Sequence, residues 1–368
     1  MSGAYRHYGW ECSPYSSKTR SYLRFKGIEH QDIYPTIIDF KRVIVKRLGY
    51  LVMPMVITPD DETLQDSSVI IDYLEERFPE PSIHPPGPTQ RLASLLIELN
   101  ADEWLPIIAM HTRWNDPQNS RFADKEFGAN ALPWMPRFTH SYLGHHLAGL
   151  KMRSYRKVFG ITPDTQPAID LWLEELLDCL SEHFETYPFL LGSRPCIGDF
   201  ALYGPLYAHV MRDPGSSHWV NRRPLVRAWI DRLREPSAEV GDFVDNDEVP
   251  STLDPLFRRM FREQFPILEQ TVERVSSWLE EHPNASKLPR GLGEGEFTLG
   301  GVSGQRQIMT FQQWMLQRPL DYYKGLPEPD REQTNHFLRK VGGLNAMQTH
   351  IPNRLTRRNF RIIPELTT

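Results

Sequence analysis

The pattern of hydrophobic and polar residues near the start of the chain switches between strand-like and helix-like periodicity. Runs of four to six β-prone residues are separated by longer runs with helical spacing, which is typical of a sheet whose strands are connected through helices. The expected elements are, in order, a strand at 5–10, a helix at 14–26, a strand at 29–34, a β-rich run at 51–58, a turn at 59–62, and a helix from 67 to about 78. The order predicts a βαβ unit followed by a ββα unit within residues 1–80.

The strand signals fade after residue 88. Prolines concentrated in residues 79–88 form a linker that no helix can cross. Beyond it, apolar residues recur with a period near 3.6, a pattern seen for example at Leu173, Leu176, Leu177 and Leu180. Helices are expected within 89–116, 165–187, 199–212 and 223–234. We therefore predict a linker at 81–88 and an all-helical domain at 89–235.

The last third of the chain predicts a mostly helical extension, residues 236–368. Residues 235–252 are acidic and contain proline, as expected of a linker, and residues 253–283 and 328–341 show helical spacing around a glycine-rich stretch at 291–304. Because disordered segments lack this much apolar mass, the extension is expected to pack on the helical domain. The arginines of the tail are expected to be solvated or paired with acidic helices; they are Arg354, Arg357, Arg358 and Arg361.

Composition narrows the class of protein. The 368 residues carry a net charge of −5 with 24% charged residues, which is ordinary for a globular protein and argues against a general nucleic-acid binder. The three cysteines, Cys12, Cys179 and Cys196, lack the C-x-x-C spacing of a zinc site. No run of 18 apolar residues occurs, so we expect a cytoplasmic protein without membrane contact. No metal is expected.

A helix start follows the first predicted strand directly. Ser13 is a favourable N-cap, Pro14 suits the first helical position, and Gly27 suits the residue after the helix. The first-turn N–H groups of such a helix point at whatever lies beside Ser13, and they favour a thiolate or another small anion. Ser13 is therefore a helix cap at a corner that favours a small anion.

Two further motifs follow in order, Val-Met-Pro at 52–54 and Gln-Asp-Ser-Ser at 65–68. Together with the Ser-Pro start, they resemble the thioredoxin-like half of the glutathione S-transferases. The resemblance implies that Ser13 carries the catalytic hydroxyl and that Met53, before a cis Pro54, pairs with the cysteinyl part of glutathione. It also implies that Asp66 and Ser67 hold the γ-glutamyl end. A helical domain with a capping box at Cys196–Asp199 fits the same family, although serine or threonine is usual where Cys196 stands.

Other residues compete for these roles. Cys12 is a rival nucleophile, although a buried thiol is the simpler interpretation. Tyr8 is a second rival, because some classes of the family carry a catalytic tyrosine on the first strand. The family's usual lysine two residues before the cis-proline is replaced by Val52, and Lys41 or Lys46 could supply the missing cation.

The resemblance implies a glutathione transferase in which glutathione is the co-substrate and its thiolate attacks a small apolar electrophile. A homodimer is possible, since the family is usually dimeric. One alternative is glutathione-dependent reductive exchange through Cys12. The other is a non-catalytic binding module that kept the fold and lost the ligand.

Overall fold

A four-stranded sheet organises the N-terminal part of the computed structural model, which describes residues 3–237 and 239–365. The strands are β1 (Tyr5–Tyr8), β2 (His30–Ile33), β3 (Met55–Ile57) and β4 (Thr63–Gln65). Their order is β2-β1-β3-β4, with β1 parallel to β2 and antiparallel to β3, and β3 antiparallel to β4. The predicted thioredoxin-like arrangement is confirmed.

The helices of this part of the chain are α1 (Pro14–Phe25), α2 (Ile37–Asp39), α3 (Val45–Leu48) and α4 (Ser67–Arg77). A π-helical segment, Phe40–Ile44, joins α2 to α3. Both long helices begin at polar caps, since Ser13 accepts a hydrogen bond from the Ser16 N–H, and Asp66 accepts from the N–H groups of Ser68 and Val69. These caps fix the direction in which each helix leaves the sheet.

An all-helical region follows, as predicted. Its helices are α5 (Pro88–Glu103), α6 (Pro106–Asn115), α7 (Pro117–Ala131), α8 (His140–Gly144), α9 (Leu150–Val158), α10 (Gln166–His183), α11 (Ile197–Pro205), α12 (Ser217–Asn221) and α13 (Pro224–Arg234). The segment expected as one helical stretch at 89–116 is two helices, because Pro106 starts a new one. The helices between 117 and 158 were not predicted.

The predicted capping box ties α11 into the core. The buried Asp199 carboxylate accepts hydrogen bonds from the N–H groups of Cys196 at 2.9 Å and Leu190 at 3.0 Å, and from Trp229 Nε1 at 2.9 Å. Gly204 on the same helix lies against α1, where a Cβ would come within 2.6 Å of the Pro14 carbonyl oxygen. Because only glycine permits this approach, α11 sits directly behind the start of α1.

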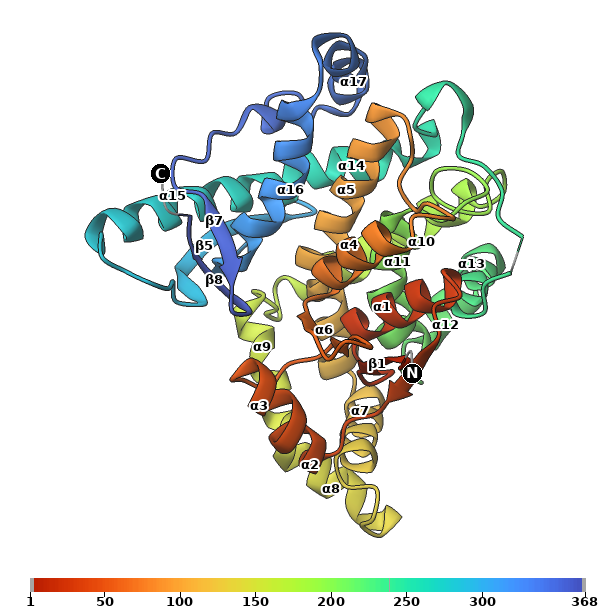
Figure 1. Cartoon of the computed structure of the whole chain (residues 1–368), viewed down its shortest axis with the longest axis vertical. Coiled ribbons are helices and arrows are strands. Elements are labelled where there is room, and N and C mark those ends of the chain that lie inside the picture. Colours follow the sequence, from red (N-terminus) through yellow and green to blue (C-terminus); the bar gives the residue numbers. More distant parts are fainter. Residues whose placement is uncertain (1–2, 238, 366–368) are drawn as a thin grey trace.

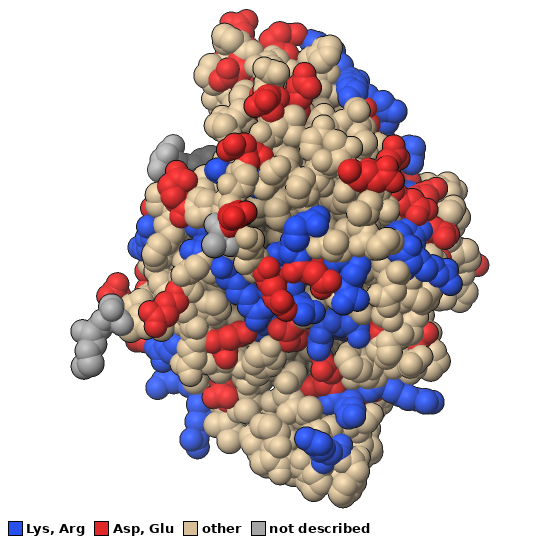
Figure 2. All heavy atoms as spheres, turned by 90° about the vertical axis from the view of Figure 1, so that its right-hand side faces the viewer, with Lys and Arg blue, Asp and Glu red and all other residues tan. Residues whose placement is uncertain are grey.

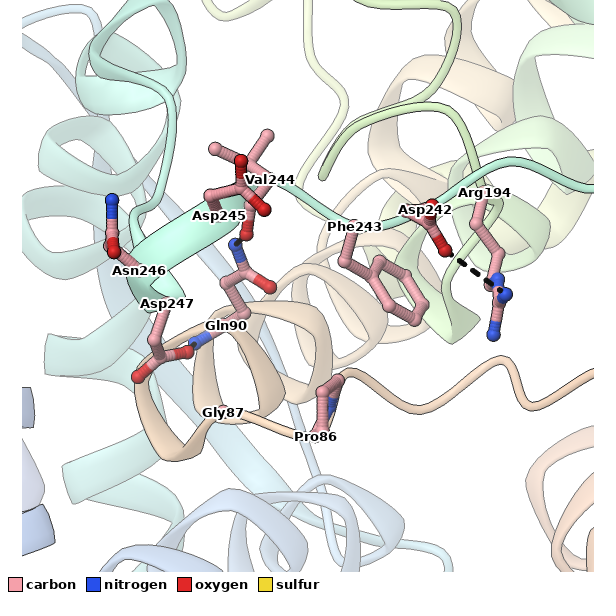
Figure 3. Close-up of a pocket in the computed structure, with 10 residues that line it drawn as sticks. All are labelled: Pro86, Gly87, Gln90, Arg194, Asp242, Phe243, Val244, Asp245, Asn246 and Asp247. Atoms are coloured by element: carbon pink, nitrogen blue, oxygen red, sulfur yellow. Dashed lines mark hydrogen bonds and ion pairs between the residues drawn. The ribbon is translucent and has the colours of Figure 1, made fainter.

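The acidic segment after α13 is ordered against the helical region rather than being a free linker. The Asp247 carboxylate accepts hydrogen bonds from the N–H groups of Thr89 and Gln90 at 2.7 and 2.8 Å, and so caps α5, whose own N-cap residue is Gly87. Gly87, Gln90 and Asp247 line part of a cavity of about 450 Å³. Figure 3 shows Asp247 beside Gln90 at one end of it, and Arg194 paired with Asp242 at the other.

The extension contains two hairpins as well as helices. Its helices are α14 (Asp254–Arg259), α15 (Phe265–Glu281), α16 (Phe311–Gly325) and α17 (Glu328–Val341), and its strands are β5 (Gly291–Leu299), β6 (Val302–Met309), β7 (Leu355–Arg358) and β8 (Arg361–Pro364). The glycine-rich stretch expected to separate helices is thus the β5–β6 hairpin. Figure 1 shows the extension, cyan to blue, beside α5.

The face that contains α12 and α13 carries charges of both signs. Figure 2 shows basic and acidic side chains intermingled there. The pairs Arg223–Asp178 and Arg227–Asp231, with nitrogen–oxygen distances of 2.6 and 2.9 Å, account for part of this mixture. Within the described residues, no helix is both long and apolar enough to cross a bilayer.

Candidate active site

The sheet brings the three predicted motifs to one edge. Tyr8, the last residue of β1, pairs with Met55, the first residue of β3, and Met55 pairs with Gln65, the last residue of β4. Ser13 follows β1, Met53 precedes β3, and Asp66 follows β4. The register alone therefore gathers the candidate residues around the end of β1, although they are spread over more than fifty positions of the chain.

The Ser13 hydroxyl has a free proton. Its oxygen accepts a hydrogen bond from the Ser16 hydroxyl at 3.0 Å and from the Ser16 N–H at 3.3 Å. Both contacts use the lone pairs of Ser13, so its own O–H remains available to donate to a ligand. Ser13 is partly exposed and caps α1, whose N-terminus adds a positive potential.

Ser16 reaches Ser13 because Gly9 leaves room for it. A Cβ on Gly9 would lie 2.6 Å from Ser16 Cβ, closer than non-bonded carbons approach. The short strand β1 and the first turn of α1 are therefore packed without space for any other residue at position 9. This close contact holds the donor that orients Ser13.

Asp66 and Ser67 start α4 in an unusual backbone conformation. Asp66 has φ +85° and ψ 134°, a region that residues other than glycine rarely adopt and that is often associated with ligand sites. Its Oδ1 accepts from both the Ser68 and Val69 N–H groups, at 3.0 and 3.4 Å. Within the described residues, neither Asp66 Oδ2 nor the Ser67 hydroxyl makes a hydrogen bond. Both are therefore available to a ligand.

A buried charge network fixes α4 against its neighbours. Lys18 Nζ of α1 lies 2.7 Å from a Glu98 oxygen and 2.6 Å from an Asp102 oxygen, both on α5. The Ser68 hydroxyl donates to the same Glu98 carboxylate at 2.7 Å. The neighbouring carboxylates hold the pKa of Lys18 above its usual value despite its burial. Because a buried lysine needs such partners, the network locks α1, α4 and α5 together behind Asp66 and Ser67.

The peptide bond between Met53 and Pro54 is cis, as the resemblance implies. Met53 is partly exposed and Pro54 is buried. Met53 lies two residues before β3, which pairs with β4, the strand that ends just before Asp66. The structure therefore places a partly exposed residue where the resemblance requires one.

The rival groups are enclosed. Cys12 is only 4% exposed, and burial raises the pKa of its thiol to about 12. Tyr8 is buried within the sheet. The Tyr15 hydroxyl, two residues after Ser13, donates to the Asp102 carbonyl at 2.9 Å and is thus occupied. Among these groups Ser13 alone combines partial exposure with a free proton.

Residues of the extension border the same edge, and no local sequence signal indicated it. The Arg357 guanidinium donates through Nη1 to the Gln65 carbonyl at 2.9 Å and through Nη2 to the Gln65 side chain. The Tyr50 hydroxyl lies 3.0 Å from Gln65 Oε1 and donates to the Phe360 carbonyl at 2.7 Å. These contacts join positions about 300 apart in the chain.

The two lysines that could replace the missing cation make no comparable contact with this edge among the described residues. Lys41 and Lys46 are both exposed, and neither forms an ion pair with a residue in the described ranges. Elsewhere, His145 lies 3.2 Å from an Asp124 oxygen, and His140 contacts the Met135 carbonyl. In residues 3–237 and 239–365, no group of three His, Cys, Asp or Glu side chains is arranged to hold a metal.

Comparison with known proteins gives matches in both halves of the expected architecture. Residues 8–82 match the family model for the glutathione S-transferase N-terminal domain, and residues 173–232 match the model for the glutathione S-transferase C-terminal domain. Both matches end before the extension begins.

Individual relatives are distant. The isoprene-epoxide–glutathione S-transferase of Rhodococcus sp. (strain AD45) is 23% identical over 238 residues, which cover 61% of this chain and 92% of the relative. The stringent starvation protein A homolog of Pasteurella multocida (strain Pm70) is 27% identical over 128 residues, or 34% of this chain and 58% of the relative.

Among solved structures, a glutathione S-transferase of Methylobacterium radiotolerans in complex with glutathione sulfonate is 20% identical, with a TM-score of 0.42, covering 66% of this chain and all of that one. The beta-etherase LigF of Sphingobium sp. strain SYK-6 is 19% identical, with a TM-score of 0.46, covering 64% of this chain and 95% of that one. The two family-model matches, in the order expected for an N-terminal and a C-terminal domain, support a member of the glutathione S-transferase family.

Proposed function

We propose that this protein is a glutathione transferase that joins the thiolate of glutathione to a small apolar electrophile. The observation that carries the proposal is the Ser13 hydroxyl, whose O–H is free to donate at the start of α1, on the same sheet edge as Met53 and the Asp66–Ser67 pair. The name of the Rhodococcus relative, an isoprene-epoxide transferase, supports an epoxide or a similarly small electrophile as the second substrate.

Ser13 would act by stabilising the thiolate. A glutathione thiol with a pKa of about 9 is mostly protonated at neutral pH. Lowering its pKa by about two units requires about 2.7 kcal/mol. One hydrogen bond from the Ser13 O–H to sulfur, together with the N-terminal potential of α1, is of the right size. The thiolate then attacks an electrophilic carbon, the bond from that carbon to its leaving oxygen or halide breaks, and solvent protonates an alkoxide where one forms.

The tripeptide would be held along the sheet edge. The backbone of Met53 would pair with the cysteinyl residue, which places the sulfur beside Ser13. The N–H and hydroxyl of Ser67 would bind the γ-glutamyl carboxylate at the N-terminus of α4, and Asp66 Oδ2 would accept the α-ammonium group. The free hydrogen-bonding capacity of Asp66 and Ser67 supports this assignment.

Reductive exchange through Cys12 lacks this support, because the thiol is buried and its pKa is raised. A non-catalytic binding module is the second candidate. The observation in its favour is that Arg357 and Tyr50 bring the C-terminal hairpin against Gln65, beside the proposed site. Such a module would keep the fold without turning over glutathione.

Calorimetric titration with glutathione tests the binding step, and consumption of free thiol in the presence of epoxides tests the chemistry. Asp66→Asn keeps a good N-cap residue and removes only the charge, so it should weaken binding about tenfold or more. Asp60→Asn, on the exposed turn before β4, is the matched control and should leave affinity unchanged. Absence of any heat at millimolar glutathione would refute the proposal. Binding without thiol consumption would favour the binding module.

A further inference from the structure

The β7–β8 hairpin packs against the edge of the proposed glutathione site. Arg357 holds both the main chain and the side chain of Gln65, the residue immediately before Asp66. On the other side of the hairpin, the Phe360 carbonyl receives the hydroxyl of Tyr50, two residues before Val52. The hairpin therefore bridges the strand end that carries Asp66 and the turn that carries Met53.

Two cations at this edge have no anionic partner among the residues that the structure describes. The Arg361 guanidinium stacks over the Tyr50 ring at 5.0 Å, and Arg290, just before β5, is exposed. Within the described residues, neither side chain forms a hydrogen bond or an ion pair. The charges of Arg361 and Arg290 both lower the pKa of Tyr50, although burial raises it overall. Arg290 acts in the same direction on the pKa of Tyr15, so its charge is within electrostatic reach of both hydroxyl groups.

In the proposed binding mode of glutathione, the glycyl end of the tripeptide lies toward these two arginines. With the γ-glutamyl end at Asp66 and Ser67 and the cysteinyl residue at Met53, the glycyl end continues past Met53 toward Val52 and Tyr50. That end is a carboxylate, and Val52 offers it no charge. Guanidinium groups match carboxylates in planar geometry and form strong, charge-assisted hydrogen bonds.

We propose that Arg361 and Arg290 bind the glycyl carboxylate of glutathione, so that the C-terminal extension completes a site which the thioredoxin-like domain begins. The proposal rests on the proposed function, since it concerns the same ligand. Arg357 is a positioning residue. Its guanidinium donates to Gln65, so it would not contact the ligand itself, and it would act by holding the backbone just before Asp66 in place.

The arrangement has a consequence for selectivity. A peptide thiol whose glycyl carboxylate is blocked loses the contacts with both arginines but keeps those with Met53, Asp66 and Ser67. Glutathione should therefore bind more tightly than its glycyl ethyl ester. Because the pairing is partly exposed, added sodium chloride should reduce that difference.

The test is calorimetric titration of the full-length protein with glutathione and with glutathione glycyl ethyl ester. The variants are Arg361→Gln, Arg290→Gln and the double variant. Arg358→Gln is the matched control, because Arg358 is an exposed arginine of the same hairpin, paired with Arg361 in the β7–β8 register and free of side-chain contacts in the described structure. Thermal unfolding of each variant establishes that the fold is retained.

We expect Arg361→Gln to weaken glutathione binding about tenfold and the double variant to weaken it further, while both bind the ester as the unmodified protein does. Arg358→Gln should match the unmodified protein with both ligands. Equal affinity of all variants for glutathione would overturn this inference and leave the proposed function standing. Tighter binding by Arg361→Gln would also overturn it, since the hairpin would then obstruct the site. If the unmodified protein binds no glutathione at all, the proposed function itself fails, and this inference fails with it.

Discussion

Replacing Ser13 by alanine tests the proposed chemistry at a single atom. The Ser13 oxygen already accepts from Ser16, so the substitution removes one O–H donor from the sulfur and leaves the N-terminus of α1 in place. A hydrogen bond to a charged group is worth about 1.5–3 kcal/mol. At about 1.4 kcal/mol per pKa unit, the pKa of the bound thiol should rise by about one to two units.

The rise is measurable in two ways. Ultraviolet absorbance of the thiolate, followed against pH for the glutathione complex, gives the pKa of the bound thiol directly. The rate of conjugation at neutral pH should fall about ten- to a hundredfold and recover as the pH passes the new pKa. Affinity for glutathione should change little, because the tripeptide contacts of Met53, Asp66 and Ser67 are untouched.

Cys12→Ala is the control for this experiment. Cys12 is buried beside Ser13 and its thiol stays protonated at neutral pH, so the variant should keep the pH profile of the unmodified protein. An unchanged thiol pKa in Ser13→Ala would refute the role given to Ser13. Loss of activity in Cys12→Ala with normal Ser13→Ala would move the chemistry to reductive exchange.

Other predictions concern the fold. Arg113→Ala leaves the buried Asp213 carboxylate unpaired and removes the donor to the Cys12 carbonyl, so the free energy of unfolding in urea should fall by about 3–5 kcal/mol. Arg227→Ala, at an exposed ion pair, should lower it by less than about 1 kcal/mol. Equal losses in the two variants would contradict the role given to burial. Burial lowers the pKa of His7 and of His183 to about 4, below the unfolded value of 6.5. The free energy of unfolding should therefore fall as the pH drops from 6.5 toward 4, by up to about 1.4 kcal/mol per pH unit for each histidine. A free energy of unfolding that stays constant over this range would contradict the lowered pKa values. Truncation to residues 1–235 removes the Asp247 cap of α5 and should lower the thermal midpoint, and an equally stable truncated protein would show that the extension is not part of the fold.

The N-terminal fold and the gathering of the site could be predicted because their signals are local. Ser13 before Pro14 and Asp66 before Ser67 are helix starts, and the β-prone runs between them leave few ways to order the strands. Once that order is fixed, the register brings Ser13, Met53 and Asp66 together without further information. The unusual φ of Asp66 could not be predicted, since it depends on the packing of α4.

The β5–β6 hairpin was missed although a signal was present. Gly300 and Gly301 form its turn with positive φ, and Phe297 and Leu299 alternate with exposed residues on the strand before it. A two-residue glycine turn between alternating runs is a hairpin signature, and it indicates two strands here rather than a separator between helices. The alternation carried more information than the composition.

The contacts of the tail had no comparable signal. Arg354 pairs with Asp321 and Glu365, as expected for a tail arginine, whereas Arg357 binds Gln65 at a separation of 292 residues. Nothing in either local sequence distinguishes these two arginines. Such contacts follow from how α16 and α5 pack, and only the three-dimensional structure shows them.

A crystal structure of the full-length protein with glutathione would show where each part of the tripeptide binds. We expect the sulfur within hydrogen-bond distance of Ser13 Oγ, the γ-glutamyl end at Asp66 and Ser67, and the glycyl carboxylate beneath Arg361. Glutathione bound elsewhere, or with its sulfur disulfide-linked to Cys12, would contradict this expectation.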